Sequence, residues 1–367
     1  MRILVGMPEQ GAQGGPGACE PPFLEELRLA GHEVEEEVYV YARVNVAFHS
    51  RAQRVLKTAR VLRQRLRQSE FDLIHINTSF DVKALLRDAS IVPHLHSKRT
   101  KIFLKFHGSD ASLLETKNPA LATVRRRVLS HADGIGVLSS EERTNFLRAG
   151  VPEKKVFLVK NVVETGAQAP NSEFFRHWSL PDDHPLLLFI GRFIPAKGLL
   201  DVILACGLLR DAGRKFLLLC VGDGPARAAA EAMVAEHDLK SRVRFFGYIP
   251  EQETREFYAH STLLLFPTYH IEGFPMVIFN AAANGLPVIT TRIRAAADYL
   301  HEPENCYWVE PKNPEMLAQK IVQLLNTSEL RSTMALKNRA LAQRFSANIV
   351  AAEYVSIYRQ LIAPQED

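Results

Sequence analysis

Short apolar runs alternate with polar stretches of helical length along the whole chain. This alternation is typical of strands joined by crossover helices in a parallel sheet. It occurs twice, because it restarts after residues 170–185, a segment with Pro, Asn, Ser and Asp that suits a linker. The pattern predicts an α/β fold with two doubly wound domains. The predicted strands are residues 2–6, 34–41, 73–77, 102–106, 134–138 and 156–159, and then 186–191, 216–222, 243–246, 263–266, 288–290 and 306–309.

The length of 367 residues, 47% of them hydrophobic, allows two domains with their own cores. The longest apolar runs, 186–190 and 216–221, are far shorter than the roughly 20 residues of a membrane-spanning helix. Residues 1–8 are expected to form a strand rather than a signal peptide, so we expect a cytoplasmic protein. The four cysteines are far apart and form no Cys-x-x-Cys pair, which argues against a zinc site and a disulfide framework.

Residues 272–291 join an acidic loop to a short helix and a buried strand. Gly273 and Pro275 suit a loop that turns into a helix over 276–284, and Gly285 is a typical C-terminal stop. The N–H groups and positive dipole end of such a helix start can hold a pyrophosphate, while the Glu272 carboxylate can accept hydrogen bonds from sugar hydroxyls. The segment predicts a nucleotide-sugar site, although any α/β protein can contain these elements in this order.

Two cations, Arg192 and Lys197, follow the first predicted strand of the second domain, between Gly191 and Gly198. Positive charge at this place would stabilise a departing nucleoside diphosphate. The alternative is a solvated pair of loop charges.

Two features of the first domain admit a functional and a structural interpretation. His107 is predicted to follow the strand 102–106, where it either reaches a ligand or forms a structural hydrogen bond. The glycines of residues 11–17, before a predicted helix over 22–30, either let the backbone approach a ligand or form a plain turn.

These motifs resemble the retaining GT-B glycosyltransferases of family 4. Three matching segments are Gly191-Arg-x-x-x-x-Lys-Gly, His107-Gly-x-Asp and Gly31-His-Glu-Val. A fourth, Glu272-Gly-Phe-Pro, stands at the start of the family's pattern of Glu, seven residues and a second Glu. The resemblance implies two Rossmann-like doubly wound domains facing a central cleft, with the C-terminal helix crossing back to the first domain. It implies an acceptor domain over 1–165 plus a helix at about 351–367, and a donor domain over 181–350.

The resemblance also implies roles for single residues. Glu272 would hold sugar hydroxyls, Arg192 and Lys197 the pyrophosphate, and His107 would lie close to the transferred sugar. Position 280 is Asn where the family's second Glu holds the ribose, so we expect weaker donor binding than in a Glu form and tighter binding after Asn280→Glu. The complete expected donor site is Gly15, Gly191, Arg192, Lys197, Ile249, Glu272, Gly273, Phe274, Pro275, Met276, Val277 and Asn280.

The implied function is that of a retaining hexosyltransferase. It would move a sugar from a nucleotide-diphosphate donor, a UDP-sugar before a GDP-sugar, to a glycan or lipid-linked acceptor in polysaccharide or glycoconjugate biosynthesis. The sequence contains no Asp-x-Asp and no metal-ligand spacing, so transfer is expected to need neither metal nor cofactor. Two alternatives stay open: a nucleotide-sugar 2-epimerase of the same fold, and a non-catalytic nucleotide-sugar binder, which Asn280 suggests.

Residues 51–67 contain many Arg and Lys residues and no acidic one, beside an apolar stripe at helical spacing. The segment predicts a helix whose charged face is either simply solvated or attracted to anionic lipid headgroups, which would suit a lipid-linked acceptor. Nucleic acid is disfavoured as a partner, because no aromatic residues are interleaved with the basic ones.

Overall fold

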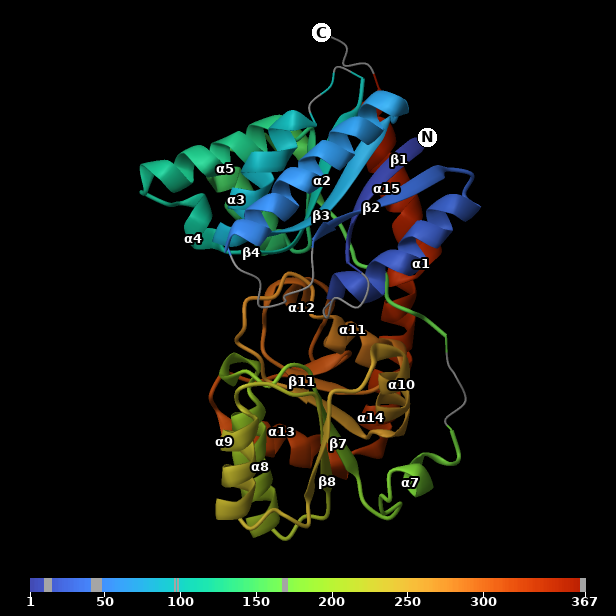
Figure 1. The fold of residues 1–367 in the computed structure, drawn as a ribbon. Helices are drawn as coiled ribbons and strands as arrows, with labels where there is room; N and C mark the ends of the chain where they lie inside the picture. Colours follow the sequence, from blue (N-terminus) through green and yellow to red (C-terminus); the bar gives the residue numbers. More distant parts are fainter. Residues whose placement is uncertain (10–14, 41–47, 96, 98, 167–170, 364–367) are drawn as a thin grey trace. The chain divides into compact units, whose positions relative to one another are not determined.

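The computed structural model describes residues 1–9, 15–40, 48–95, 97, 99–166 and 171–363 (Figure 1). Contacts divide the chain into two compact units. Unit 1 is Met1–Val162, Ile271–Phe274 and Ala347–Asp367, and unit 2 is Val163–His270 and Pro275–Ser346. The C-terminal helix therefore belongs to unit 1, while the segment predicted as a linker belongs to unit 2 and contains a short helix.

Unit 1 contains a six-stranded parallel sheet, as predicted. In spatial order its strands are β2 (Glu33–Val40), β1 (Arg2–Pro8), β3 (Leu73–Phe80), β4 (Lys101–Ser109), β5 (Gly134–Val137) and β6 (Val156–Leu158). Its helices are α1 (Gly15–Leu29), α2 (Phe48–Gln68), α3 (Val82–Ile91), α4 (Ala111–Leu114), α5 (Pro119–His131), α6 (Ser140–Arg148) and α15 (Ala347–Ile362), with 3-10 turns η1 (Val92–His94) and η2 (Glu153–Lys155).

Unit 2 contains a second six-stranded parallel sheet, also as predicted. In spatial order its strands are β12 (Cys306–Trp308), β11 (Val288–Thr290), β10 (Leu263–Phe266), β7 (Leu186–Ile190), β8 (Leu217–Val221) and β9 (Val243–Gly247). Its helices are α7 (Phe174–His177), α8 (Leu199–Asp211), α9 (Arg227–Glu236), α10 (Glu251–His260), α11 (Met276–Ala283), α12 (Arg294–Tyr299), α13 (Pro314–Asn326) and α14 (Ser328–Ala342), with 3-10 turns η3 (Pro195–Lys197) and η4 (Gln343–Phe345).

The predicted ends of two strands in unit 1 are wrong. Strands β3 and β4 continue beyond residues 77 and 106, and Phe80 still pairs with Ser109. His107 therefore lies within the last part of β4 and not after it. The reason is that backbone hydrogen bonds continue through polar residues, which an apolar pattern cannot detect.

The predicted start of the first helix is also wrong. Residues 11–14 lie outside the described residues, but Gly15 is the first residue of α1 and not part of a loop. Pro21 and Pro22 lie inside this helix, although proline usually marks a helix start. Burial of the apolar face around Phe23 outweighs the loss of helical hydrogen bonds.

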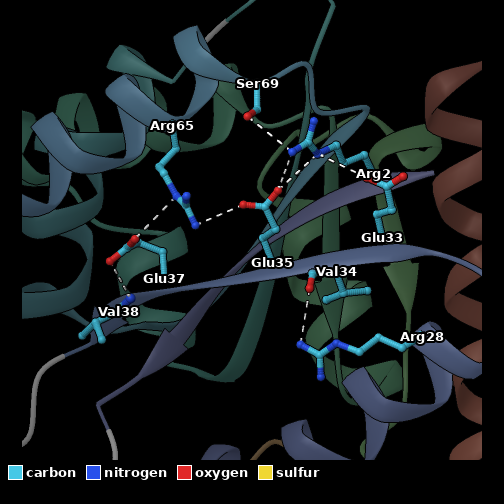
Figure 2. A network of polar contacts seen from close by, with 9 residues as sticks. All are labelled: Arg2, Arg28, Glu33, Val34, Glu35, Glu37, Val38, Arg65 and Ser69. Atoms are coloured by element: carbon cyan, nitrogen blue, oxygen red, sulfur yellow. Dashed lines mark hydrogen bonds and ion pairs between the residues drawn. The ribbon is translucent and has the colours of Figure 1, made fainter.

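Strand β2 lies at the edge of the sheet, and arginines from three other elements contact its glutamates or its backbone (Figure 2). Glu35 accepts a hydrogen bond from Arg2 at 2.8 Å and lies 3.1 Å from Arg65 of α2, which is also 3.9 Å from Glu37. Arg28 of α1 donates to the backbone oxygen of Val34 at 3.4 Å. Charge on an edge strand discourages pairing with another chain. Arg65 is thus a structural cation that joins α2 to the sheet.

Helix α15 packs onto unit 1 through two buried tyrosines. The Tyr354 ring lies 4.7 Å from that of Phe23 in α1, and the Tyr358 ring lies 5.6 Å from that of Phe103 in β4. The Tyr358 hydroxyl forms a hydrogen bond with Nδ1 of His75 in β3. These contacts fix the C-terminal helix against the centre of the unit 1 sheet.

Candidate functional site

In both sheets the order in which successive strands are added reverses beside the first strand. In unit 1 the chain passes from β1 to β2 and returns to β3 on the other side of β1; in unit 2 it passes from β7 to β8 and β9 and returns to β10 on the other side of β7. Doubly wound sheets bind ligands at the carboxyl ends of their strands, at such a switch point. The segments that follow β1, β7 and β10 are therefore candidate binding segments.

The loop after β7 carries the two predicted cations. Arg192 is exposed, and its side chain has no hydrogen-bond or ion-pair partner among the residues that the structure describes. Lys197, in the 3-10 turn η3, is only 8% exposed, and its ammonium lies 5.1 Å from the centroid of the Phe266 ring at the end of β10. The neighbouring Gly198 has a φ of 82°, and a Cβ there would lie 2.5 Å from the oxygen of Pro267. Close packing therefore fixes the backbone beside Lys197.

A second loop supports the first one from the end of β8. Phe193 donates a backbone hydrogen bond to Asp223 at 2.8 Å. Gly222 has a φ of 132°, and a Cβ there would lie 1.9 Å from the oxygen of Gly191. The lack of a side chain at Gly222 thus lets the two loops touch through their backbones.

Helix α11 starts at Met276 after the loop that follows β10, which confirms the predicted helix start. The first N–H groups of a helix have no partner within the helix and attract anions. At the other end, Gly285 has a φ of 72° and Leu286 donates to Ala281 at 2.9 Å, so the predicted glycine stop is confirmed. The helix start lies at the carboxyl end of β10, where Pro275 and Val277 flank Met276.

Asn280 lies one turn further along α11 and is half-buried. Its Nδ2 donates to Oε1 of Glu251 at 3.2 Å, and it also interacts with the buried hydroxyl of Tyr258. Glu251 is the first residue of α10. Ile249, two positions earlier, is half-buried like Asn280. Burial raises the pKa of the Glu251 carboxyl, which the Asn280 hydrogen bond opposes and the charge of Glu164 reinforces. Glu251 was not predicted from the sequence; its one local signal is an acidic residue at a helix start.

In unit 1, His107 lies over a buried polar cluster. Its Nε2 is 2.8 Å from Oδ1 of Asn77 in β3. Asn77 Nδ2 donates to Gly6 O at 3.3 Å and to Glu20 Oε2 at 3.2 Å. The other carboxylate oxygen of Glu20 accepts a hydrogen bond from Lys105 at 2.5 Å. Glu20, Asn77 and Lys105 were not predicted, although a lysine inside the apolar run of β4 was a usable signal.

The cluster keeps His107 neutral. Burial and the charge of Lys105 lower the pKa of His107 to about 3, although Glu20 acts in the opposite direction. Burial alone would raise the pKa of Glu20, but Lys105 and the two nearby histidines lower it to about 2. Because the Asn77 amide nitrogen donates elsewhere, its oxygen faces His107, so Nε2 carries the hydrogen of the neutral ring and Nδ1 is an acceptor.

Cys19, Glu20 and His107 each offer a ligand atom, and these atoms lie within 4.8 Å of one another. Such a grouping could hold a metal ion. The ammonium of Lys105 already lies 2.5 Å from Glu20, so a cation would have to displace it from a buried pair. We therefore interpret the cluster as the charge balance beneath His107.

The predicted residues fall into two groups. Gly191, Arg192, Lys197, Ile249, Pro275, Met276, Val277 and Asn280 belong to unit 2, and Gly15, His107, Glu272, Gly273 and Phe274 belong to unit 1. Within unit 1, Gly273 lies close to His107, because a Cβ on Gly273 would be 3.1 Å from the backbone oxygen of His107 and 3.2 Å from Oε2 of Glu142. Glu272, one residue earlier, is half-buried.

Comparison with known proteins adds two family matches. Residues 170–341 match the family model of glycosyl transferases group 1, and residues 20–167 match that of glycosyltransferase family 4. The N-acetyl-alpha-D-glucosaminyl L-malate synthase of Bacillus anthracis is 22% identical to this chain over 99% of the chain and 98% of its own length.

Two solved structures share the fold. The sucrose-phosphate synthase of Thermosynechococcus elongatus has a TM-score of 0.76 and 21% identity, with 98% of each chain covered. The Anabaena protein HepE in complex with UDP-glucose has a TM-score of 0.76 and 19% identity, with 97% of this chain and 99% of that chain covered.

Proposed function

The chain belongs to the family 4 glycosyltransferases of GT-B fold, and from this premise we propose that it transfers a hexosyl unit from a nucleotide-diphosphate sugar with retention of configuration. One observation carries the proposal. Arg192 and Lys197 follow β7, the start of α11 follows β10, and these two strands are neighbours in the sheet. A diphosphate bound at this switch point would meet two cations and a helix start.

In this proposal the leaving diphosphate is stabilised by unit 2. When the bond between the anomeric carbon and the diphosphate oxygen breaks, negative charge grows on the diphosphate. Buried Lys197 acts on that charge with little screening, and exposed Arg192 can bind phosphate oxygens in a bidentate manner. These two side chains and the N–H groups at the start of α11 would do the work of a metal ion, so we propose transfer without metal or cofactor.

The remaining residues would position the sugar. The Glu272 carboxylate would accept hydrogen bonds from sugar hydroxyls, and the N–H groups of residues 273–277 would hold the diphosphate. His107 would contact the transferred sugar as a neutral ring, which its lowered pKa supports. We propose that the donor nucleotide is UDP in preference to GDP, which the solved HepE structures with UDP and UDP-glucose support.

The proposed acceptor is a glycan or a lipid-linked sugar, reached by a cytoplasmic enzyme at an anionic membrane surface. Within the described ranges, no helix is long and apolar enough to cross a membrane. Helix α2 packs its apolar stripe on the unit 1 core, while Leu56 on its outer side is 56% exposed. Lys57, Arg60, Arg63 and Arg67 are exposed nearby, and no ion pair with another described residue involves them. An exposed leucine among unpaired cations suits lipid headgroups.

The membrane proposal is tested by sedimentation with vesicles that contain phosphatidylglycerol or only phosphatidylcholine. We expect binding to the anionic vesicles alone, and its loss in the double variant Lys57→Glu/Arg60→Glu. The matched control is Lys240→Glu/Lys337→Glu, which changes two exposed lysines of unit 2. Equal binding of the two variants would contradict the proposal for α2.

The catalytic proposal is tested by release of nucleoside diphosphate from UDP- and GDP-sugars, with and without acceptor glycans. Lys197→Met is expected to lower kcat by roughly 100-fold or more, because it removes charge that stabilises the transition state. Exposed Lys240→Met is the control and should keep the rate. A wild-type rate in Lys197→Met, or an epimerised donor as the product without acceptor, would contradict sugar transfer by this site.

A further inference from the structure

The start of helix α10 lies beside the middle of helix α11 at the carboxyl edge of the unit 2 sheet. Helix α10 follows β9 and begins with Glu251, and helix α11 follows β10 and carries Asn280. The two helices contact each other, and Asn280 Nδ2 donates to Glu251 Oε1 at 3.2 Å. A carboxylate of one helix and a carboxamide of the next therefore stand side by side at the edge where ligands bind.

The charge of Glu251 is not cancelled by a cation. Arg255, one turn later on α10, forms an ion pair with Glu164 at 2.5 Å. Among the described residues, Asn280 is the hydrogen-bond donor found for the Glu251 carboxylate, and it occupies one oxygen. The carboxylate can thus still accept hydrogen bonds from a ligand, and the Asn280 amide holds it in place.

The position of Asn280 along α11 indicates which part of a nucleotide would lie beside Asn280 and Glu251. Asn280 lies four residues after Met276, which is about 6 Å along a helix axis. A diphosphate at the start of α11 would place the next group of a nucleotide, its pentose, about one helical turn away. A pentose offers two adjacent hydroxyls, and a carboxylate binds such a pair with two charge-assisted hydrogen bonds.

We propose that Glu251, held by Asn280, binds the ribose diol of the nucleotide and supplies the negative charge that position 280 lacks. This inference rests on the proposed function, because it requires a nucleoside diphosphate in unit 2. It also reverses the expectation for Asn280→Glu. A carboxylate at position 280 would stand next to that of Glu251, and like charges at this distance disfavour each other.

The first test measures binding of UDP and 2′-deoxy-UDP to the full chain by calorimetry. We expect Glu251→Gln to weaken UDP binding by about tenfold or more, because both hydroxyls lose a charged acceptor, while 2′-deoxy-UDP, which keeps one of the two hydroxyls, should lose less. The preference for the ribonucleotide should therefore fall. Glu253→Gln is the control, because Glu253 lies in the same helical turn and it is Glu251 that accepts the Asn280 hydrogen bond.

The second test exchanges the two groups. Asn280→Glu alone should weaken UDP binding, and the double variant Glu251→Gln/Asn280→Glu should restore much of the preference for UDP, because it again pairs one carboxylate with one carboxamide. An unchanged preference in Glu251→Gln, or tighter UDP binding in Asn280→Glu, would overturn the role of Glu251. If Lys197→Met still loses UDP affinity in that case, the diphosphate site stands and this inference alone fails. If the wild type binds no nucleoside diphosphate, both fail.

Discussion

Lys105→Met is expected to destabilise unit 1 strongly, because it leaves the carboxylate of Glu20 buried without its counter-charge. The two side chains are 2% and 0% exposed, and their charged atoms are 2.5 Å apart. Breaking such a pair by removing one partner costs about 3–5 kcal/mol. The lowered pKa of Glu20, from 4.5 to about 2, corresponds to about 3 kcal/mol and agrees with this magnitude.

The matched control is Lys101→Met on the same strand. Lys101 lies 3.4 Å from Asp133, and the two side chains are 29% and 30% exposed. Partly exposed pairs contribute less, so a loss below about 1 kcal/mol is expected. The double variant Glu20→Gln/Lys105→Met should lose less than the sum of its single variants, because neither charge is then left unpaired.

The assay is urea unfolding followed by circular dichroism and by tryptophan fluorescence. Both tryptophans, Trp178 and Trp308, belong to unit 2, so fluorescence follows unit 2 while circular dichroism follows the whole chain. A loss in Lys105→Met no larger than in Lys101→Met would refute the reasoning. Additivity in the double variant would refute it as well.

The pH dependence of the free energy of unfolding provides an independent test of the Glu20–Lys105 pair. The folded pKa of Glu20 lies below its unfolded value, so its stabilisation is complete above pH 4.5 and is lost as the pH falls from 4.5 toward 2. In Lys105→Met the folded pKa of Glu20 should instead rise, because burial is the largest cause and the largest opposing charge is then gone. That variant should become more stable as the pH falls from 7 toward 4.5, whereas the wild type should not. The difference between the two proteins should therefore shrink on acidification.

Three further outcomes follow from single contacts. Gly222→Ala should destabilise unit 2 in tryptophan-detected unfolding, because its Cβ would lie 1.9 Å from the oxygen of Gly191, whereas Gly213→Ala meets no atom within 4 Å and should lose only what its φ of 66° costs. Asn77→Leu should remove the partner of His107 Nε2, so the nitrogen shifts of that ring in NMR should move from one tautomer toward a mixture; unchanged shifts would contradict the role of Asn77. Because the pKa of His107 is about 3, its titration should not appear in the transfer rate between pH 5 and 9, and a step that disappears in His107→Gln would contradict this.

The sheets and the helix α11 could be predicted because their signals are local. Fully buried parallel strands are continuous apolar runs, and the start and stop of α11 are marked by Pro275 and Gly285 within the same segment. The cations of unit 2 could be found for a related reason, since Arg192 and Lys197 stand together in one loop. The ends of β3 and β4 could not be found, because polar residues such as Thr78 and Ser109 continue the ladder there.

The polar cluster of unit 1 depends on strand order, which local patterns do not reveal. Glu20, Asn77 and Lys105 come from α1, β3 and β4, and they meet because β3 lies between β1 and β4 in the sheet. Each residue alone has an ordinary structural explanation. Their meaning as a charge balance for His107 appears only when the three distances are known together.

Position 280 shows how a contact distant in sequence can reverse an argument that is sound for one residue. Taken by itself, Asn280 has lost a charge, and restoring Glu should strengthen ribose binding. Its partner Glu251 stands 29 positions earlier and 3.2 Å away, and it already provides a carboxylate. Adding a second one would then raise the cost of ionising both. The sign of the Asn280→Glu effect therefore depends on Glu251, and the same exchange made in Glu251→Gln should act in the opposite direction.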